Sequence, residues 1–325
     1  MSIIETVAGH LNPRVPDVWR ISGRELPLDR PFVVGILNVT PDSFSDGGQF
    51  ESTDAALVQV ERMVAEGADA LDVGGESTRP QEAHSVSAAE EKRRILPVVR
   101  AIRRRFAALP ISVDTTKSDV ASAALAEGAE IINDVSGFRI DPRMGEIATA
   151  AHAGVVLMHS RGSVEEMGTY RHATYGDDVM ADIRSELDRS LRNALESGIH
   201  QHAIVLDPGI GFAKRSEHSL RVLAELERLM SLGCPIMVGV SRKRFIGELS
   251  GVATASERVA GTVGANVAAL LHGARLFRVH DVAPNRQALD VAWGVIQADQ
   301  VRAGRSSDSP VVHGSQFPVP GSRDQ

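Results

Sequence analysis

The chain has 325 residues, a formal net charge of −7 and 43 % apolar residues, while aromatic residues make up only 4 %. This length suits one large α/β barrel or two ordinary domains, and the core must be aliphatic. The acidic balance excludes a general nucleic-acid binder, and no apolar stretch approaches the ~20 residues that cross a bilayer. The single cysteine, Cys234, excludes an intrachain disulfide and indicates a reducing compartment. We therefore expect a cytoplasmic protein, without a signal peptide and without nucleic-acid or membrane partners.

Short apolar runs alternate with longer stretches of helical periodicity along the chain. The runs are continuously apolar, as is typical of parallel strands that are covered on both faces. They lie at residues 33–37, 70–73, 110–114, 130–134, 154–158, 203–207, 235–240 and 275–279. Eight runs are what a closed barrel requires, so the pattern predicts a (β/α)8 TIM barrel. A doubly wound sheet is the alternative, but it would gather polar residues at one switch point.

Helical periodicity fills the intervals between these runs, for example at residues 52–67, 87–107, 178–198 and 256–273. Gly67, Gly128 and Gly198 lie near the ends of three such stretches, where helix C-caps favour glycine. Residues 1–32 form an N-terminal extension, and its VWRI segment is predicted to form a hairpin that plugs the bottom of the barrel. Residues 33–303 form the barrel. Residues 304–325 are rich in Ser, Pro, Gly and Asp and are predicted to be a disordered tail.

Polar residues follow each predicted strand, where the active site of a (β/α)8 barrel is built. In chain order they are Asn38, Gly74–Pro80, Asp114, Asn133 and Asp134, His159, Asp207, Ser241–Lys243, and Arg278 with His280 and Asp281. Carboxylates and amides come from the middle strands, and cations come from the second, seventh and eighth strands. This segregation predicts a ligand with two chemically different parts.

The middle strands fit the first part of such a ligand. Asp114, Asn133 and Asp207 could hold a flat heterocycle, because carboxylates accept paired N–H donors. For Asp207 alone, a helix N-cap is an equally good interpretation. His159 is better interpreted as a buried, hydrogen-bonded histidine, and Asp134 as structural.

The cations fit the second part. Arg278, His280 and Lys243 could hold a phosphate group, and the loop at Ser241 could add backbone N–H contacts to the anion. The neutral amide of Asn38 could give an oxygen to a Mg²⁺ ion that also binds phosphate. Asp281 is better interpreted as structural.

Eight short segments together carry a family resemblance over about residues 31–300. They are GILNVTPDSFSDGG (35–48), DVGGESTRP (72–80), SVDT (112–115), IINDVSG (131–137), LMH (157–159), LDPGIGFAK (206–214), SRK (241–243) and RVHDV (278–282). In content and order they resemble the motifs of dihydropteroate synthases. The segment after LMH departs from the family pattern, since it reads Ser160, Arg161, Gly162.

The resemblance implies roles for particular residues. The pterin-binding positions correspond to Asp114, Asn133, Asp207 and Lys243. The metal-binding asparagine corresponds to Asn38, and the pyrophosphate-binding pair to Arg278 and His280. The p-aminobenzoate pocket, where sulfonamides compete, corresponds to Phe44, Thr78, Arg79, Pro80, Phe212, Ser241 and Lys243.

The resemblance also implies a reaction: a pterin pyrophosphate condenses with p-aminobenzoate, and pyrophosphate leaves with the help of Mg²⁺. The residues expected to be catalytic are Asp114, Lys243 and Asp46, and Phe44 and Asp46 lie on a loop that closes over the substrates in this family. A homodimer is expected. The alternatives are a catalytically silent paralogue and a methyltetrahydrofolate-binding methyltransferase, although the latter would need neither the SRK nor the RVH segment.

Overall fold

The computed structural model describes residues 16–39, 49–76 and 86–302. In these ranges eight parallel strands form one sheet, in the order β8-β7-β6-β5-β4-β3-β10-β9. Their bounds are Phe32–Asn38 (β3), Ala70–Gly74 (β4), Ile111–Asp114 (β5), Ile131–Asp134 (β6), Gly154–Met158 (β7), Ile204–Asp207 (β8), Met237–Val238 (β9) and Leu276–Val279 (β10). A parallel bridge between Leu206 and Ile236 joins the two edge strands. The predicted (β/α)8 barrel is confirmed, and the doubly wound sheet was the wrong alternative.

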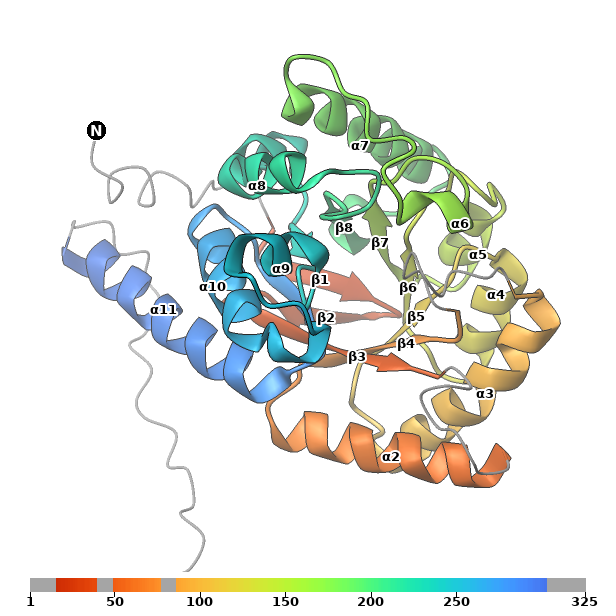
Figure 1. Cartoon of the computed structure of the whole chain (residues 1–325). Coiled ribbons are helices and arrows are strands. Elements are labelled where there is room, and N and C mark those ends of the chain that lie inside the picture. The colour runs from red at the N-terminus through yellow and green to blue at the C-terminus, as the bar shows by residue number, and fades with distance from the viewer. Residues whose placement is uncertain (1–15, 40–48, 77–85, 303–325) are drawn as a thin grey trace, which may run out of the picture.

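Helices surround the strands on the outside, as Figure 1 shows. They are Gln49–Ala65 (α2), Ala88–Arg105 (α3), Ser118–Ala126 (α4), Met144–Ala150 (α5), Val164–Met167 (α6), Val179–Glu196 (α7), Ser216–Ala224 (α8), Arg244–Ser250 (α9), Val259–Leu271 (α10) and Val282–Arg302 (α11). Short 3₁₀ helices lie at Gln201–Ala203 (η2), Leu226–Leu232 (η3) and Ala255–Glu257 (η4). The predicted glycine caps follow α2, α4 and α7 with positive φ angles, as Gly67, Gly128 and Gly198.

The predicted N-terminal hairpin is present as β1 (Val18–Ile21) and β2 (Arg24–Pro27), paired antiparallel. Its apolar side chains share one core with residues from inside the barrel. This interior core consists of Trp19, Ile21, Leu26, Leu28, Phe32, Val34, Ala70, Ile131, Val156, Val205, Met237 and Leu276. The Trp19 indole N–H donates to the Ala203 carbonyl at 2.9 Å, which fixes the hairpin to the start of β8. The hairpin therefore closes the N-terminal end of the barrel.

A second, larger core lies between the outward faces of the strands and the helices. It is aliphatic, as the composition predicted, and it contains Cys234, whose side chain is fully buried. The seventh strand of the barrel, β9, consists of Met237 and Val238 and is much shorter than the apolar run at residues 235–240 that predicted it. Pro235 has no N–H to donate, and the chain turns after Gly239, where the Lys243 N–H bonds to the Val240 carbonyl at 3.1 Å. The predicted tail at 304–325 lies outside the described residues.

Candidate active site

Polar side chains occupy the interior of the barrel directly above its apolar core. Successive side chains of a strand point to opposite faces, so a residue two positions after a core residue also points inward. Ala70, Ile131, Val205 and Leu276 belong to the interior core. The residues two positions later are Asp72, Asn133, Asp207 and Arg278. The strand geometry therefore gathers these four polar residues inside the barrel, toward its C-terminal end.

Strand pairing places several predicted site residues in one row across the barrel wall. Asn38 pairs with Gly74, Gly74 with Asp114, and Asp114 with Asn133. A Cβ atom at Gly74 would lie 3.7 Å from Asp114 Oδ2 and 3.9 Å from Asn38 Oδ1. The small glycine thus leaves these two oxygens facing each other across one strand.

Arg278 connects this row to the other side of the barrel. Its Nη2 donates to Asp114 Oδ2 at 2.7 Å, and its Nε donates to Asp72 Oδ2 at 2.6 Å. The same Asp72 oxygen accepts from Asn133 Nδ2 at 2.9 Å. Four strands, β4, β5, β6 and β10, are therefore linked through one guanidinium and two carboxylates.

Burial and the opposite charge of the partner shift the pKa values of Asp114 and Arg278 in opposite directions. Burial raises the pKa of Asp114, and the neighbouring Asp72 carboxylate adds to the rise, while the Arg278 guanidinium opposes it. Burial lowers the pKa of Arg278, but the Asp72 and Asp114 carboxylates outweigh burial and keep it above its usual value. The arginine therefore stays charged, and the Asp114 carboxyl group keeps its proton to a higher pH than it would in water.

The loop after β8 brings together the next group of predicted residues. Asp207 is buried, and its Oδ1 accepts from the Gly209 N–H at 2.7 Å, so it shapes this loop and does not cap a helix. Lys243 donates to the Ile210 carbonyl, and its Nζ lies 4.3 Å from the centre of the Phe212 ring. At Gly211 the backbone has φ +78°, which favours glycine, and an added Cβ would lie 3.1 Å from Lys243 Cδ.

The pKa of Lys243 differs strongly from that of a lysine in water. Burial lowers its pKa to about 7, although the Asp207 carboxylate acts in the opposite direction. Burial also raises the pKa of Asp207, and Lys243 is the main group opposing that rise. A lysine that titrates near neutral pH next to a buried carboxylate is typical of a functional site.

The loops after β9 and β10 supply the remaining cations. Ser241 Oγ accepts from the His280 N–H at 3.1 Å and lies 2.9 Å from His280 Nδ1. The Ser241 hydroxyl therefore holds both the backbone and the ring of His280 in place. Between Ser241 and Lys243, Arg242 has φ +59° and forms a bidentate pair with Asp281 at 2.6 and 2.9 Å. This pair joins the two loops and fixes Lys243 relative to His280.

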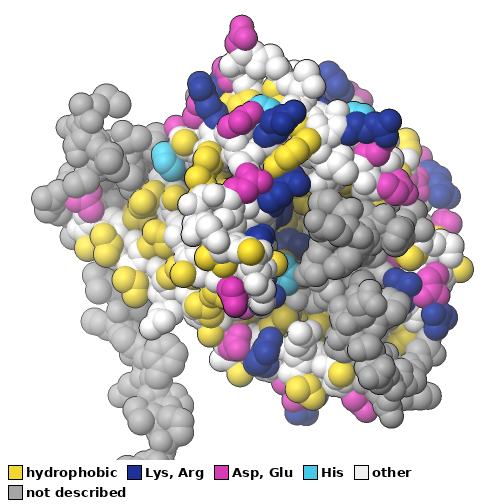
Figure 2. Space-filling view, viewed as in Figure 1, with side chains coloured by type: hydrophobic (Ala, Val, Ile, Leu, Met, Phe, Trp, Pro, Cys, Tyr) yellow, Lys and Arg dark blue, Asp and Glu magenta, His cyan; other side chains and the backbone are white. Residues whose placement is uncertain are grey.

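Seen from one face, the molecule has Lys and Arg side chains in a central hollow, with a histidine among them (Figure 2). Phe44, Asp46, Thr78, Arg79 and Pro80 lie outside the described residues, so their roles stay predictions. Ser241 was assigned to the arylamine pocket; its hydroxyl contacts His280, and its role in that pocket stays a prediction.

The interpretations of two other residues are supported by their contacts. His159 is buried between Glu186 and Lys214, with Nε2–Oε2 at 3.0 Å and Nδ1–Nζ at 2.8 Å. Burial lowers its pKa to about 4, so it is a neutral, hydrogen-bonded histidine. Asp134 accepts two bonds from Ser136, from its N–H and its hydroxyl, each at 2.7 Å, and shapes a turn.

Sequence reasoning missed two important residues. Asp72 holds both Arg278 and Asn133, and the signal was a carboxylate inside an apolar strand, two residues before the paired Gly74. Lys214 is only 1 % exposed and supports the loop after β8. Nothing in the sequence around Lys214 indicates that it is buried.

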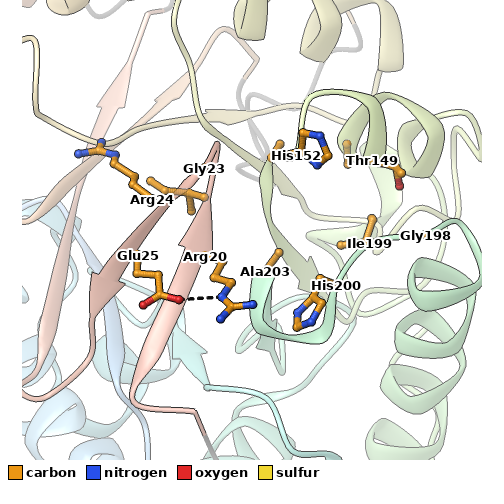
Figure 3. Close-up of a pocket in the computed structure, with 13 residues that line it drawn as sticks. Arg20, Gly23, Arg24, Glu25, Thr149, His152, Gly198, Ile199, His200 and Ala203 are labelled. Atoms are coloured by element: carbon orange, nitrogen blue, oxygen red, sulfur yellow. Dashed lines mark hydrogen bonds and ion pairs between the residues drawn. The ribbon is translucent and has the colours of Figure 1, made fainter.

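A separate cavity of about 340 Å³ lies at the opposite end of the barrel, beside the N-terminal hairpin (Figure 3). Its arginines are already neutralised: Arg20 pairs with Glu25 at 2.8 Å, and Arg24 pairs with Glu130 at 2.6 Å. Active sites of (β/α)8 enzymes lie at the C-terminal face, so this cavity is not the candidate site.

Comparisons with known proteins agree with this geometry. Residues 34–280 match the model of a family described as pterin binding enzyme. A dihydropteroate synthase of Synechocystis is 42 % identical over 263 residues, which cover 81 % of this chain and 89 % of that protein. The mitochondrial folate synthesis bifunctional protein of Arabidopsis thaliana is 42 % identical over 280 residues, and the chain spans 50 % of its length.

Solved structures of dihydropteroate synthases are also similar to this chain. Dihydropteroate synthase of Xanthomonas albilineans with 4-aminobenzoic acid has a TM-score of 0.79 and 45 % identity, covering 87 % of this chain and 98 % of that one. The same enzyme in complex with 7,8-dihydropteroate has a TM-score of 0.76 and 42 % identity, covering 86 % and 99 %. A Yersinia pestis dihydropteroate synthase with a sulfonamide drug complex has a TM-score of 0.78 and 40 % identity, again covering 86 % and 99 %.

Proposed function

Because the chain belongs to the family of pterin-binding enzymes, we propose that it acts as a dihydropteroate synthase in folate biosynthesis. It joins 6-hydroxymethyl-7,8-dihydropterin pyrophosphate to p-aminobenzoate and gives 7,8-dihydropteroate and pyrophosphate. The relatives with this single activity are covered almost completely, at 89 % for the Synechocystis enzyme. The bifunctional plant relatives are covered only by half, so their second activity is not transferred to this chain.

The observation that carries this proposal is the set of acids and cations that the strands gather at the C-terminal end of the barrel, where Arg278 joins them. Asp72, Asp114, Asn133 and Asp207 come from β4, β5, β6 and β8, whereas Lys243 and Arg278 come from the β9 loop and β10. A pterin presents amino and amide N–H groups along one edge, which carboxylate and amide oxygens can accept. Its pyrophosphate is a polyanion, which needs cations. The site therefore offers hydrogen-bond acceptors for the pterin and cations for its pyrophosphate.

The reaction forms a C–N bond between the amine of p-aminobenzoate and the exocyclic methylene of the pterin. The C–O bond to pyrophosphate breaks, and the amine loses a proton to solvent. An arylamine is a weak nucleophile, so assisting the leaving group is the effective way to lower the barrier. Positive charge then develops on the pterin, where Asp114 can stabilise it as a carboxylate held in place by Arg278.

The departing pyrophosphate is proposed to meet Arg278, His280 and Lys243. Arg278 uses Nε and Nη2 for Asp72 and Asp114, and no described residue bonds to its Nη1. The Ser241 hydroxyl orients the imidazole ring of His280, which lies 2.9 Å from it at Nδ1. Lys243, with a pKa of about 7, becomes fully charged when an anion binds beside it.

The proposed cofactor is Mg²⁺, with Asn38 as its protein ligand. Mg²⁺ prefers oxygen ligands and usually keeps several waters, so one amide oxygen together with phosphate oxygens is a suitable set. Asn38 Oδ1 and Asp114 Oδ2 both face Gly74, which puts hard oxygen atoms at the point where the charged substrate would bind. When bound, the ion would neutralise charge on the leaving pyrophosphate.

A homodimer is proposed through the face formed by α10 and α11, which lie side by side (Figure 1). Val291 and Val295 on α11 are 65 % and 66 % exposed, and Gly264 and Ala268 on α10 are exposed as well. Sedimentation of the protein before and after Val295→Asp tests this face, since the charge should shift the population toward monomers.

The protein is also proposed to work in the cytoplasm. In the described ranges, no helix is both long enough and apolar enough to span a membrane. Localisation of the full-length chain in its native cells, by fractionation, tests this proposal.

The activity is tested by measuring pyrophosphate release from the purified protein with Mg²⁺, the pterin pyrophosphate and p-aminobenzoate. Release that needs both substrates and is inhibited by a sulfonamide supports the proposal. No release from the folded protein would overturn it and favour a silent paralogue. In an active enzyme, Asp114→Asn should lower kcat by about 10²–10³, the usual cost of removing one preorganised electrostatic partner.

A further inference from the structure

Lys214 lies at the centre of a buried hydrogen-bond network that the proposed mechanism does not use. Its Nζ lies 2.8 Å from His159 Nδ1 and donates to the carbonyls of Gly209 and Phe212, both at 3.0 Å. A protonated lysine has three N–H donors, and here each has an acceptor. The geometry thus suits an ammonium group, even though burial lowers the Lys214 pKa well below its usual value.

The acceptors of Lys214 belong to the loop that carries Phe212. Most carbonyls of this loop are held: Lys214 binds those of Gly209 and Phe212, Lys243 binds that of Ile210, and the Tyr175 hydroxyl donates to that of Ala213 at 3.0 Å. Ala213 has φ +46°, an unfavourable conformation for a residue with a side chain. A loop with such a conformation needs support from its surroundings, and Lys214 provides two of these four bonds.

Behind Lys214 the network continues to the surface. His159 links Lys214 to Glu186 on α7, since its Nε2 lies 3.0 Å from Glu186 Oε2. Arg161 donates to Glu186, and its guanidinium lies 4.1 Å from the centre of the Tyr175 ring. Arg161 and Tyr175 both lie between β7 and α7, and Arg161 belongs to the segment whose sequence departs from the family pattern.

We infer that Lys214, backed by His159 and Glu186, is a positioning residue that holds Phe212 against Lys243 and so sets the affinity for the arylamine substrate. This inference rests on the proposed function. Phe212 contacts Lys243 at 4.3 Å from the ring centre to Nζ, so a displaced loop moves the wall of the proposed arylamine pocket. Asp207, by contrast, lies on β8, and its backbone is fixed by the pairing of β8 with β7, so pterin binding depends less on Lys214.

A double-mutant cycle between Lys214→Met and Phe212→Ala tests this inference. Methionine fills a similar volume but donates no hydrogen bond. Lys214→Met should raise the KM for p-aminobenzoate by about tenfold or more, because small misplacements of positioning groups have large effects. The Kd for the pterin pyrophosphate, measured by calorimetry, should change much less. In the Phe212→Ala background the Lys214 substitution should change the KM by less than about threefold, because its target is gone.

The matched control is Arg286→Met, which removes another buried cation that donates to a backbone carbonyl, that of Pro31, at 2.9 Å. It should lower stability and leave both ligand affinities unchanged. If Lys214→Met does not fold, His159→Leu replaces it, since this change leaves Lys214 two of its three acceptors. Equal effects of Lys214→Met with and without Phe212 would overturn the inference, as would equal losses for both substrates.

Hydrogen exchange gives a readout that needs no activity. Amides of residues 209–213 should exchange faster in Lys214→Met than in the wild type, and remain unchanged in Arg286→Met. Unchanged exchange in Lys214→Met would overturn the positioning role whatever the kinetics. Faster exchange in a protein without synthase activity would instead support the role of Lys214 and contradict the proposed function, so the two failures are distinguishable.

Discussion

Two lysines, the partly buried Lys117 and the buried Lys214, flank the mouth of the barrel and differ in the charge of their partners. Lys117 lies before α4, where its Nζ bonds to Glu76 Oε2 at 2.7 Å and Glu91 Oε2 at 2.6 Å. Lys214 lies before α8 and contacts an imidazole and two carbonyls. Burial lowers the pKa of both, but the two carboxylates outweigh it at Lys117, whose pKa ends above its usual value. The charge of the partners, and not burial alone, decides how firmly a lysine keeps its proton.

The two clusters also support different parts of the mouth. Glu76 accepts from the Val86 N–H at 3.1 Å as well as from Lys117, so the Lys117 cluster ties the end of β4 to the start of α3. The Lys214 cluster ties the β8 loop to α7. One cluster is held mainly by ion pairs and the other by neutral acceptors, which gives them different responses to mutation and pH.

The largest effect is expected for Lys117→Met. Glu91 has no exposed side-chain surface, and the substitution leaves it buried without a counter-charge. Breaking a buried ion cluster in this way should lower the free energy of unfolding by ~3–5 kcal/mol. Urea unfolding at pH 8 measures the loss. A loss under ~1 kcal/mol would contradict the view that the two carboxylate partners make Lys117 the more important lysine for stability.

Lys214→Met should cost less, about 1–3 kcal/mol. The substitution leaves His159 Nδ1 and two carbonyls without a donor, but it also removes the cost of keeping an ammonium group in surroundings without a carboxylate in contact. The same urea titration gives the value. A loss as large as that of Lys117→Met would show that partner charge is not what separates the two sites.

The pH dependence of these losses should differ in sign and range. The folded pKa of Lys214 is lowered, so between that value and the unfolded value of ~10.4 the unfolded chain binds more protons and stability rises with pH. The stability advantage of wild type over Lys214→Met should therefore grow from pH 6 to pH 9. Lys243 and Asp207 face Lys214 as well, but they are present in both proteins.

Lys117 behaves in the opposite way, because its folded pKa is raised. Its contribution is complete below the unfolded pKa of ~10.4 and is lost only as pH rises through the folded value. The titration of Lys117 itself should therefore add no pH dependence between pH 6 and pH 9. Urea unfolding of the two variants and the wild type at several pH values checks both trends, and parallel trends would refute the assignment.

The smallest effect is expected for Glu186→Gln, at the outer end of the Lys214 cluster. The Glu186 side chain is 31 % exposed, and glutamine still offers His159 an acceptor, so the loss should stay within ~1 kcal/mol. Burial raises the pKa of Glu186, but hydrogen bonds from His159 and Arg161 outweigh it and lower the value to about 2. The contribution should thus be present above pH ~4.5 and disappear as pH falls toward 2. A loss that persists at the lowest pH would exclude this electrostatic origin.

The sequence alone determined the barrel fold and the end of the barrel at which the active site lies. Apolar runs of strand length, with helical stretches between them, leave a closed parallel sheet as the fold that buries them. Polar residues at the ends of these runs then have to meet at one face. Asp114, Asn133, Asp207 and Arg278 could be identified in this way because strand periodicity is local.

Only the tertiary structure decided which of these residues bind one another. Arg278 contacts Asp72 across 206 positions of the chain, and Lys214 contacts His159 across 55. Such partners depend on how strands far apart in sequence are placed around the barrel, and local patterns carry no record of that distance. The pKa values of Lys117 and Lys214 could not be inferred from the sequence for the same reason. The residue type gives the ordinary pKa of a lysine, but the groups that surround it in the fold determine how far that pKa shifts.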